Sequence, residues 1–124
     1  MPIEVCWNND AIEYKCTGVV TLDDVRVADE ATFNDERFPT AKYLLINAIE
    51  IESVELSELD IQIDIANDFQ HSLNNESLKL AFATNRPDIR QVADFYVAQF
   101  RKRHFDWEVR AFDSLVEANM WLSG

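Results

Sequence analysis

The chain has 124 residues, of which 48% are hydrophobic, and a formal charge of −12 at pH 7. This length and apolar content are typical of a domain that folds without disulfides or metals, so we predict a single domain over residues 1–124. The acidic balance repels phosphate backbones, which excludes nucleic acid as an expected partner. No apolar run approaches the ~20 residues of a membrane helix and the start lacks a signal peptide's basic segment. We therefore expect a cytoplasmic protein and not a membrane protein.

Two apolar or alternating segments open the chain, residues 3–7 and 11–20, with the turn residues Asn-Asn-Asp between them. This pattern predicts an antiparallel hairpin. Its register would place Cys16 opposite the first residues of the hairpin, about 10 Å along the ladder from Cys6 at ~3.3 Å per residue, which is too far for a disulfide. We therefore expect two free thiols and a reducing compartment.

The rest of the chain alternates between helical and strand patterns. In chain order these are a helix over Leu22–Asn34, a strand at Tyr43–Ile46, a helix over Leu59–Leu73, a strand at Leu78–Ala83, a helix from Pro87 to the turn Arg101–His104, a strand at Trp107–Phe112, and a final helix carrying Leu115, Ala118, Trp121 and Leu122. The expected N-caps are Thr21, Ser57, Asn85 and Asp113. The order β-β-α-β-α-β-α-β-α predicts an α/β fold with a mixed five-stranded sheet and four helices. The strand at 43–46 reads as the central one, because it is uninterruptedly apolar.

The apolar residues of the segment 59–73 fit both the alternation of a strand and the spacing of a helix, but the length of the segment and the capping box at Ser57 favour a helix. One side of that helix collects Leu59, Ile63, Ala66, Phe69 and Leu73, which we expect to face the sheet, and another collects Asp60, Asp64, Asn67, Asp68 and His71. The apolar arc is wider than core packing requires. We therefore predict that Ile61 or Ile65, on a second apolar flank, contacts a ligand pocket or an interface.

The tail Val109–Leu122 combines an apolar strand, an Asp, then Glu-Ala and Trp-Leu. Together with the element order and the two buried strands, it resembles the small stand-alone bacterial SpoIIAA-like (STAS/SEC14-type) proteins, relatives of anti-anti-sigma factors and of the cytoplasmic domains of sulfate transporters. The resemblance implies a mixed sheet with helices on its faces. It also implies a regulatory or ligand-binding module and not an enzyme.

One departure from that pattern concerns phosphorylation. Anti-anti-sigma proteins carry a phosphorylatable serine in an Asp-Ser-Ser/Thr-Gly pattern after the central strand, whereas residues 47–53 here read Asn-Ala-Ile-Glu-Ile-Glu-Ser. Ser53 and Ser57 are the nearby candidates. A phosphate on Ser53 would meet the charges of neighbouring glutamates, so we do not expect a phosphoserine switch.

The sequence singles out no catalytic or metal-binding set. His71 and His104 have no cysteine or carboxylate at metal-ligand spacing, and two glycines cannot build a phosphate-binding loop. Carboxylates are so frequent that pairs of them arise by chance. We therefore expect no catalysis, no metal and no cofactor.

The loop 84–90 follows an interior strand and leads into a helix, the place where open α/β sheets bind ligands and where helix N–H groups attract anions. Asn85, Arg86 and Arg90 are the candidate contacts, although Asp88 could satisfy the same N–H groups. The predicted function is a non-catalytic binding module for a small-molecule or lipid-like ligand. The alternative is a regulatory module that binds a protein partner or a second copy of itself.

Overall fold

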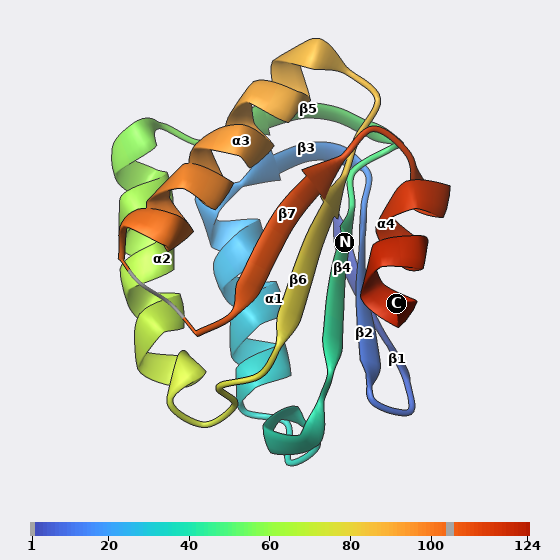
Figure 1. Cartoon of the computed structure of the whole chain (residues 1–124). Helices are drawn as coiled ribbons and strands as arrows, with labels where there is room; N and C mark the ends of the chain where they lie inside the picture. Colours follow the sequence, from blue (N-terminus) through green and yellow to red (C-terminus); the bar gives the residue numbers. More distant parts are fainter. Residues whose placement is uncertain (1, 104–105) are drawn as a thin grey trace.

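The computed structural model describes residues 2–103 and 106–124, and a five-stranded sheet forms its centre (Figure 1). The strand order is β1-β2-β4-β6-β7, with β1 antiparallel to β2 and the other neighbours parallel. The bounds are β1 Ile3–Asn8, β2 Ala11–Cys16, β4 Tyr43–Asn47, β6 Lys79–Ala83 and β7 Glu108–Phe112. The predicted mixed sheet is confirmed, and the predicted central strand lies at its middle.

The opening hairpin has the expected register. Ile3 pairs with Cys16 and Cys6 pairs with Glu13, so the two cysteines lie far apart along the ladder and both are free. Asn9 adopts a positive φ of 57° in the turn, a conformation that asparagine tolerates better than most residues.

A second, two-stranded sheet was not predicted. The chain bends at Gly18, whose φ is +62°, and β3 (Gly18–Thr21) leaves the main sheet to pair in parallel with β5 (Ile51–Glu55). A β-carbon on Gly18 would meet nothing within 4 Å, so the glycine is favoured by its backbone conformation and not by lack of space. The prediction of one strand through Val20 is therefore wrong, as is the omission of a strand after residue 50.

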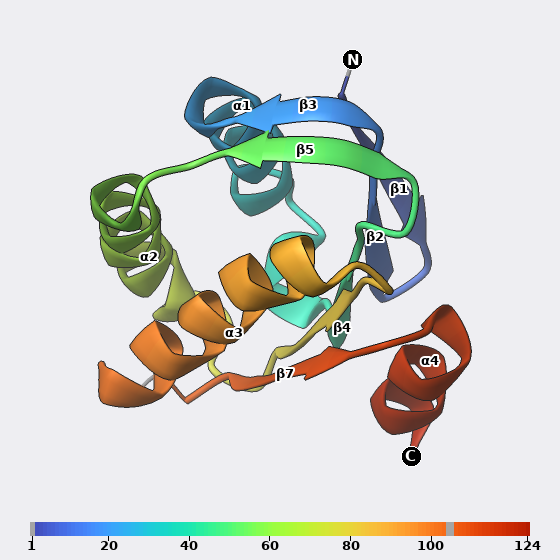
Figure 2. The same ribbon diagram turned by 90° about the horizontal axis from the view of Figure 1, so that it is seen from above.

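Four helices cover the sheet, as predicted. Figure 2 shows α1 (Leu22–Phe33), α2 (Glu58–Ser72) and α3 (Pro87–Lys102) on one side and α4 (Leu115–Ser123) alone on the other. A short 3-10 turn, η1 (Phe38–Thr40), leads into β4. None of the helices that the structure describes is long and apolar enough to cross a bilayer.

The predicted N-caps are correct for α1 and α2 and wrong by one residue for α3 and α4. Thr21 and Ser57 cap α1 and α2, each with an aspartate three residues later that bonds back to the cap. The N-cap of α3 is Arg86 and not Asn85, and it makes no side-chain cap bond. The N-cap of α4 is Ser114 and not Asp113, because its hydroxyl accepts a hydrogen bond from the backbone N–H of Glu117 at 3.2 Å.

The helix α2 presents a different face to the interior from the one predicted. Leu59, Ile63 and Leu73 are 65%, 42% and 67% exposed, whereas Ile61 and Ile65 are 3% and 0% exposed. The buried side also carries Asp64, Asp68 and Ser72. The prediction is wrong because it turned the apolar side with Leu59 and Ile63 toward the sheet, whereas the buried side of the helix includes both aspartates.

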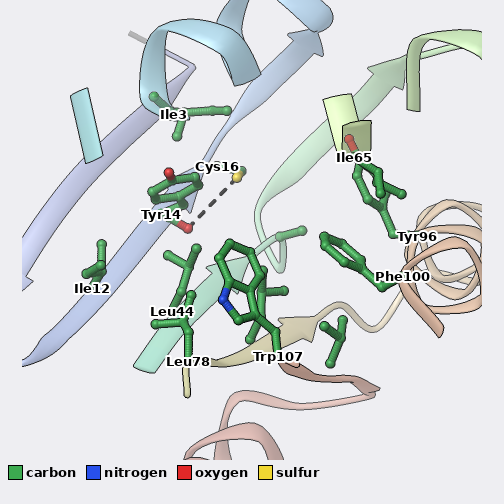
Figure 3. Close-up of a cluster of buried hydrophobic side chains, with 14 of the residues drawn as sticks. Ile3, Ile12, Tyr14, Cys16, Leu44, Ile65, Leu78, Tyr96, Phe100 and Trp107 are labelled. Atoms are coloured by element: carbon green, nitrogen blue, oxygen red, sulfur yellow. Dashed lines mark hydrogen bonds between the residues drawn. The ribbon is translucent and has the colours of Figure 1, made fainter. Parts of the chain in front are cut away.

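The alternation of side chains along the strands divides the core into two layers. In-register rows such as Ile12-Leu44-Leu80-Val109 face α1, α2 and α3, whereas Leu45, Ala81 and Ala83 pack against α4. Figure 3 shows part of the larger layer, where side chains from strands and helices meet. The doubly covered strand β4 thus contributes to both layers, with Leu44 and Leu45 pointing opposite ways.

Candidate functional site

A cavity of ≈ 90 Å³ lies in the larger core layer, between the five-stranded sheet and helices α1 to α3. Its sheet side includes Cys16, Ala83 and Thr84, at or just beyond the ends of β2 and β6. The small sheet β3–β5 forms another wall. This place, at the carboxyl ends of the parallel strands, is where open α/β sheets bind ligands.

The walls of the cavity are mostly apolar. Small residues, including Ala48, Ala83 and Ala93, leave room between larger ones. The helix α2 packs against α1 and α3 and stands away from the sheet, so the three helices arch over the space (Figure 2). The larger apolar lining residues are Val20, Val25, Leu44, Ile46, Ile51, Val54, Leu80, Phe82, Ile89, Val92 and Phe100.

Three aspartates form the polar wall of the cavity. Asp29 comes from α1, and Asp64 and Asp68 come from successive turns of α2. One carboxylate oxygen from each lies within 4.8 Å of the other two, and all three residues are buried. From the sequence we place Asp64 and Asp68 on one polar side of the predicted helix, but we do not predict a site that contains them or Asp29. The helical spacing of Asp64 and Asp68 relative to Ile61 and Ile65 is compatible with one shared buried side of α2. Nothing in the sequence, however, indicates that these two aspartates lie close to Asp29.

Two buried tyrosines bond to this cluster. The Tyr14 hydroxyl donates to Asp29 Oδ1 at 2.9 Å and lies at the same distance from Thr32 Oγ1, and the Tyr96 hydroxyl donates to Asp64 Oδ2 at 3.0 Å. Both rings are almost fully buried, and Figure 3 shows Tyr14 on its strand and Tyr96 beside Phe100. The strand β2 and the helix α3 therefore hold the carboxylates that α1 and α2 supply.

The surroundings of these carboxyl groups favour their protonated forms. Burial first, and then the charge of Asp64, raises the pKa of Asp29 well above its usual range. Burial also raises the pKa of Asp68 well above that range, and the pKa of Asp64 is raised for the same reason. Because folding raises these pKa values, the protonated aspartates stabilise the folded state, and this stabilisation is complete at a pH below the usual aspartate pKa. The stabilisation is lost as the pH rises through the raised pKa values.

In the predicted ligand loop, residues 84–90, the two arginine side chains already make hydrogen bonds within the chain. Arg86 donates to Asp88 at 2.7 Å and to the backbone oxygens of Ile51, at 3.0 Å, and Glu52. Arg90 donates to Asp94 at 2.9 Å and also to Asp113. Both guanidinium groups therefore have acceptors nearby, which argues against an anion site at this loop. Asn85 is exposed and lies in the loop between β6 and α3.

The other predicted residues do not meet at one place. Ile61 and Ile65 are buried in the core and neither lines the cavity, which argues against the predicted contact with a ligand pocket or an interface. Ser53 lies within β5, and the Ser57 hydroxyl accepts a bond from the backbone N–H of Asp60 at 3.1 Å. His71 stacks on Phe33 with ring centroids 4.8 Å apart.

His104 lies outside the described residues. Cys16 lines the cavity, and burial raises the pKa of its thiol to about 12. Its Sγ donates to the Tyr14 carbonyl at 3.8 Å (Figure 3). At neutral pH this thiol stays protonated, and a protonated thiol is a poor nucleophile.

Comparison with known proteins shows the fold. No family model matches the sequence, and the curated proteins contain no match. One similar solved structure is that of an uncharacterized protein of the DUF3478 family, with a SpoIIAA-like fold, from Shewanella loihica PV-4. The two share 15% sequence identity with a TM-score of 0.53, over 97% of this chain and 91% of that one. The chain therefore has a SpoIIAA-like fold, as the resemblance in its sequence predicted.

Proposed function

We propose that this protein is a non-catalytic binding module whose interior cavity takes a small, mainly apolar or lipid-like molecule. The observation that carries the proposal is the cavity itself, which lies at the carboxyl ends of the parallel strands and has mostly apolar walls. Ligand sites of proteins are typically concave and apolar, with a few polar groups at one side. Asp29, Asp64 and Asp68 are such groups here.

The shape of the space limits the ligand. At ≈ 90 Å³ the cavity is small for a bulky metabolite, so a slender aliphatic chain or a single small ring fits best. A ligand with many polar groups would leave them unpaired against side chains such as Val92 and Phe82, which is costly. The proposed ligand is therefore largely hydrocarbon.

Native mass spectrometry of the protein purified from cells tests this proposal. We expect a retained mass that organic solvent extracts, and a rise in melting temperature when the stripped protein is mixed with hexanol or decanol. Leu45, which packs against α4 on the other face of the sheet, provides the control, because Leu45→Val leaves the cavity walls unchanged. A bare spectrum together with no melting shift for any straight-chain alcohol would refute the proposal.

A regulatory module that binds a protein or a second copy of itself is the alternative. It is favoured by the outer side of α2, where Leu59, Ile63 and Leu73 share one side of the helix and are 65%, 42% and 67% exposed. Light scattering after gel filtration tests self-association. A dimer that becomes a monomer in Ile63→Asp would support this alternative, and a monomer at all concentrations would count against the homodimer.

A further inference from the structure

Holding the polar end of a largely hydrocarbon ligand does not account for three buried carboxylates, those of Asp29, Asp64 and Asp68. The three residues are 5%, 4% and 5% exposed, and none of the ion pairs among the described residues includes them. Charges of one sign at such short range repel strongly when water is excluded. The cluster therefore requires either protons or a cation.

Each aspartate has one buried oxygen that accepts no hydrogen bond from a hydroxyl, an amide or a backbone N–H of the described residues, and its polar neighbours are the other carboxyl groups of the cluster. These are Oδ2 of Asp29, Oδ1 of Asp64 and Oδ1 of Asp68. Buried polar atoms are almost always bonded in folded proteins, and an unbonded one is destabilising. Because the three carboxylates converge within 4.8 Å, a single ion among them would satisfy all three residues.

The neighbouring hydroxyls hold the carboxylates as they are held in metal sites. Tyr14 binds one oxygen of Asp29 at 2.9 Å, and Tyr96 binds one oxygen of Asp64 at 3.0 Å, so each carboxylate keeps its second oxygen available. Hydrogen bonds of this kind orient ligating carboxylates and contribute to metal affinity. Both tyrosines stand on regular elements, β2 and α3, which fixes their positions before a ligand binds.

We propose that Asp29, Asp64 and Asp68 form a binding site for one divalent cation that prefers oxygen ligands, namely Mn²⁺, Mg²⁺ or Ca²⁺. A set of three carboxylates with no nitrogen or sulfur donor suits these cations. The 4.8 Å limit also fits, since oxygens on opposite sides of a calcium ion lie about 4.6–5.2 Å apart. The adjoining cavity has room for water molecules that complete the coordination.

Calorimetric titration of the chelator-treated full-length chain with MnCl₂, MgCl₂ and CaCl₂ tests the proposal. We expect one ion per chain for at least one metal, with a melting temperature that rises and saturates. Asp68→Asn keeps the shape of the side chain but removes a charged ligand, so it should weaken binding by at least about tenfold. Asp23→Asn, on the exposed side of the same helix as Asp29, should leave the affinity unchanged.

A second variant separates ligation from folding. Tyr96→Phe removes only the hydroxyl that orients Asp64, and we expect it to weaken binding about tenfold while the circular dichroism spectrum stays native. The proposal is overturned if no metal gives saturable binding, or if Asp68→Asn and Asp23→Asn bind equally well. The test of the metal site is independent of the test of the apolar ligand, because native mass spectrometry detects the apolar ligand whether or not a metal ion binds.

Discussion

Filling the cavity with protein should stabilise the fold and exclude the ligand. Ala93 lies on α3 with 5% of its surface exposed, and it lines the cavity. The change Ala93→Leu adds three carbons, which contribute about 2.4 kcal/mol if all are buried at ~0.8 kcal/mol each. The ordering of the leucine side chain costs roughly 0.5–1 kcal/mol. Alanine and leucine are both strong helix formers, so the net gain in unfolding free energy should be about 1.5 kcal/mol.

The matched control is the same change at a close-packed position. Ala118 on α4 is 0% exposed and belongs to the smaller core layer, away from the cavity. Ala118→Leu should therefore lower the unfolding free energy by about 1–3 kcal/mol through overpacking. Urea unfolding measures both variants, and at this chain length each kcal/mol corresponds to a shift of about 3–6 °C in melting temperature.

The two variants also differ in what they predict for the ligand. Native mass spectrometry should show the retained mass lost in Ala93→Leu and kept in Ala118→Leu, provided that the latter is folded at the temperature of purification. If Ala93→Leu were as destabilising as Ala118→Leu, the space beside Ala93 would be closed to a side chain. The cavity would then be too tight for the proposed ligand as well.

Three further predictions concern the core and the thiols. Leu45→Ala should cost about 2–5 kcal/mol in urea unfolding, because Leu45 is 5% exposed on the central strand, and a loss below about 0.5 kcal/mol would contradict the doubly covered strand. Ile61→Asp should cost more than about 4 kcal/mol and Ile63→Asp less than about 1 kcal/mol, since the first residue is 3% and the second 42% exposed; equal losses would contradict the orientation of α2. In the native protein a thiol reagent at pH 8 should label Cys6 before Cys16, whose buried thiol has a pKa of about 12, and both should react in denaturant without reductant. Labelling of Cys16 as fast as Cys6 would show that this wall of the cavity is open.

Local patterns in the sequence were enough to predict most of the fold. The uninterrupted apolar runs at 43–46 and 78–83 became β4 and β6, and the capping boxes at Thr21 and Ser57 mark where α1 and α2 begin. These signals depend on residues close to one another along the chain. The strand β5 gave no such signal, because Glu52 and Glu55 are exposed in a short segment that pairs only with distant β3.

The candidate site depended on information that the sequence does not carry. Acidic residues usually face solvent. A prediction that follows this rule buries the wrong side of α2, because Asp64 and Asp68 lie on its buried side. Asp64 and Asp68 are buried because Tyr96 and the side chain of Asp29 lie opposite them, and both of these belong to other helices. Such a cluster becomes visible only when the helices are placed together. The loop 84–90 is predicted from its place between a strand and a helix N-terminus and from Arg86 and Arg90, and the sequence does not show the hydrogen bonds that these arginines make within the chain.

The bend at Gly18 has a consequence for how the interior is reached. Because β3 leaves the main ladder there, the strands β3 and β5 are hydrogen-bonded as a pair to each other, and they form one wall of the cavity. Arg86, the N-cap of α3, donates hydrogen bonds to the backbone oxygens of Ile51 and Glu52 and so links α3 to this pair of strands. Local opening draws on the parts of a protein with the fewest shared backbone bonds. We therefore expect exchange of a molecule with the interior to require loss of the Arg86 hydrogen bonds but not of the hydrogen bonds within the five-stranded sheet.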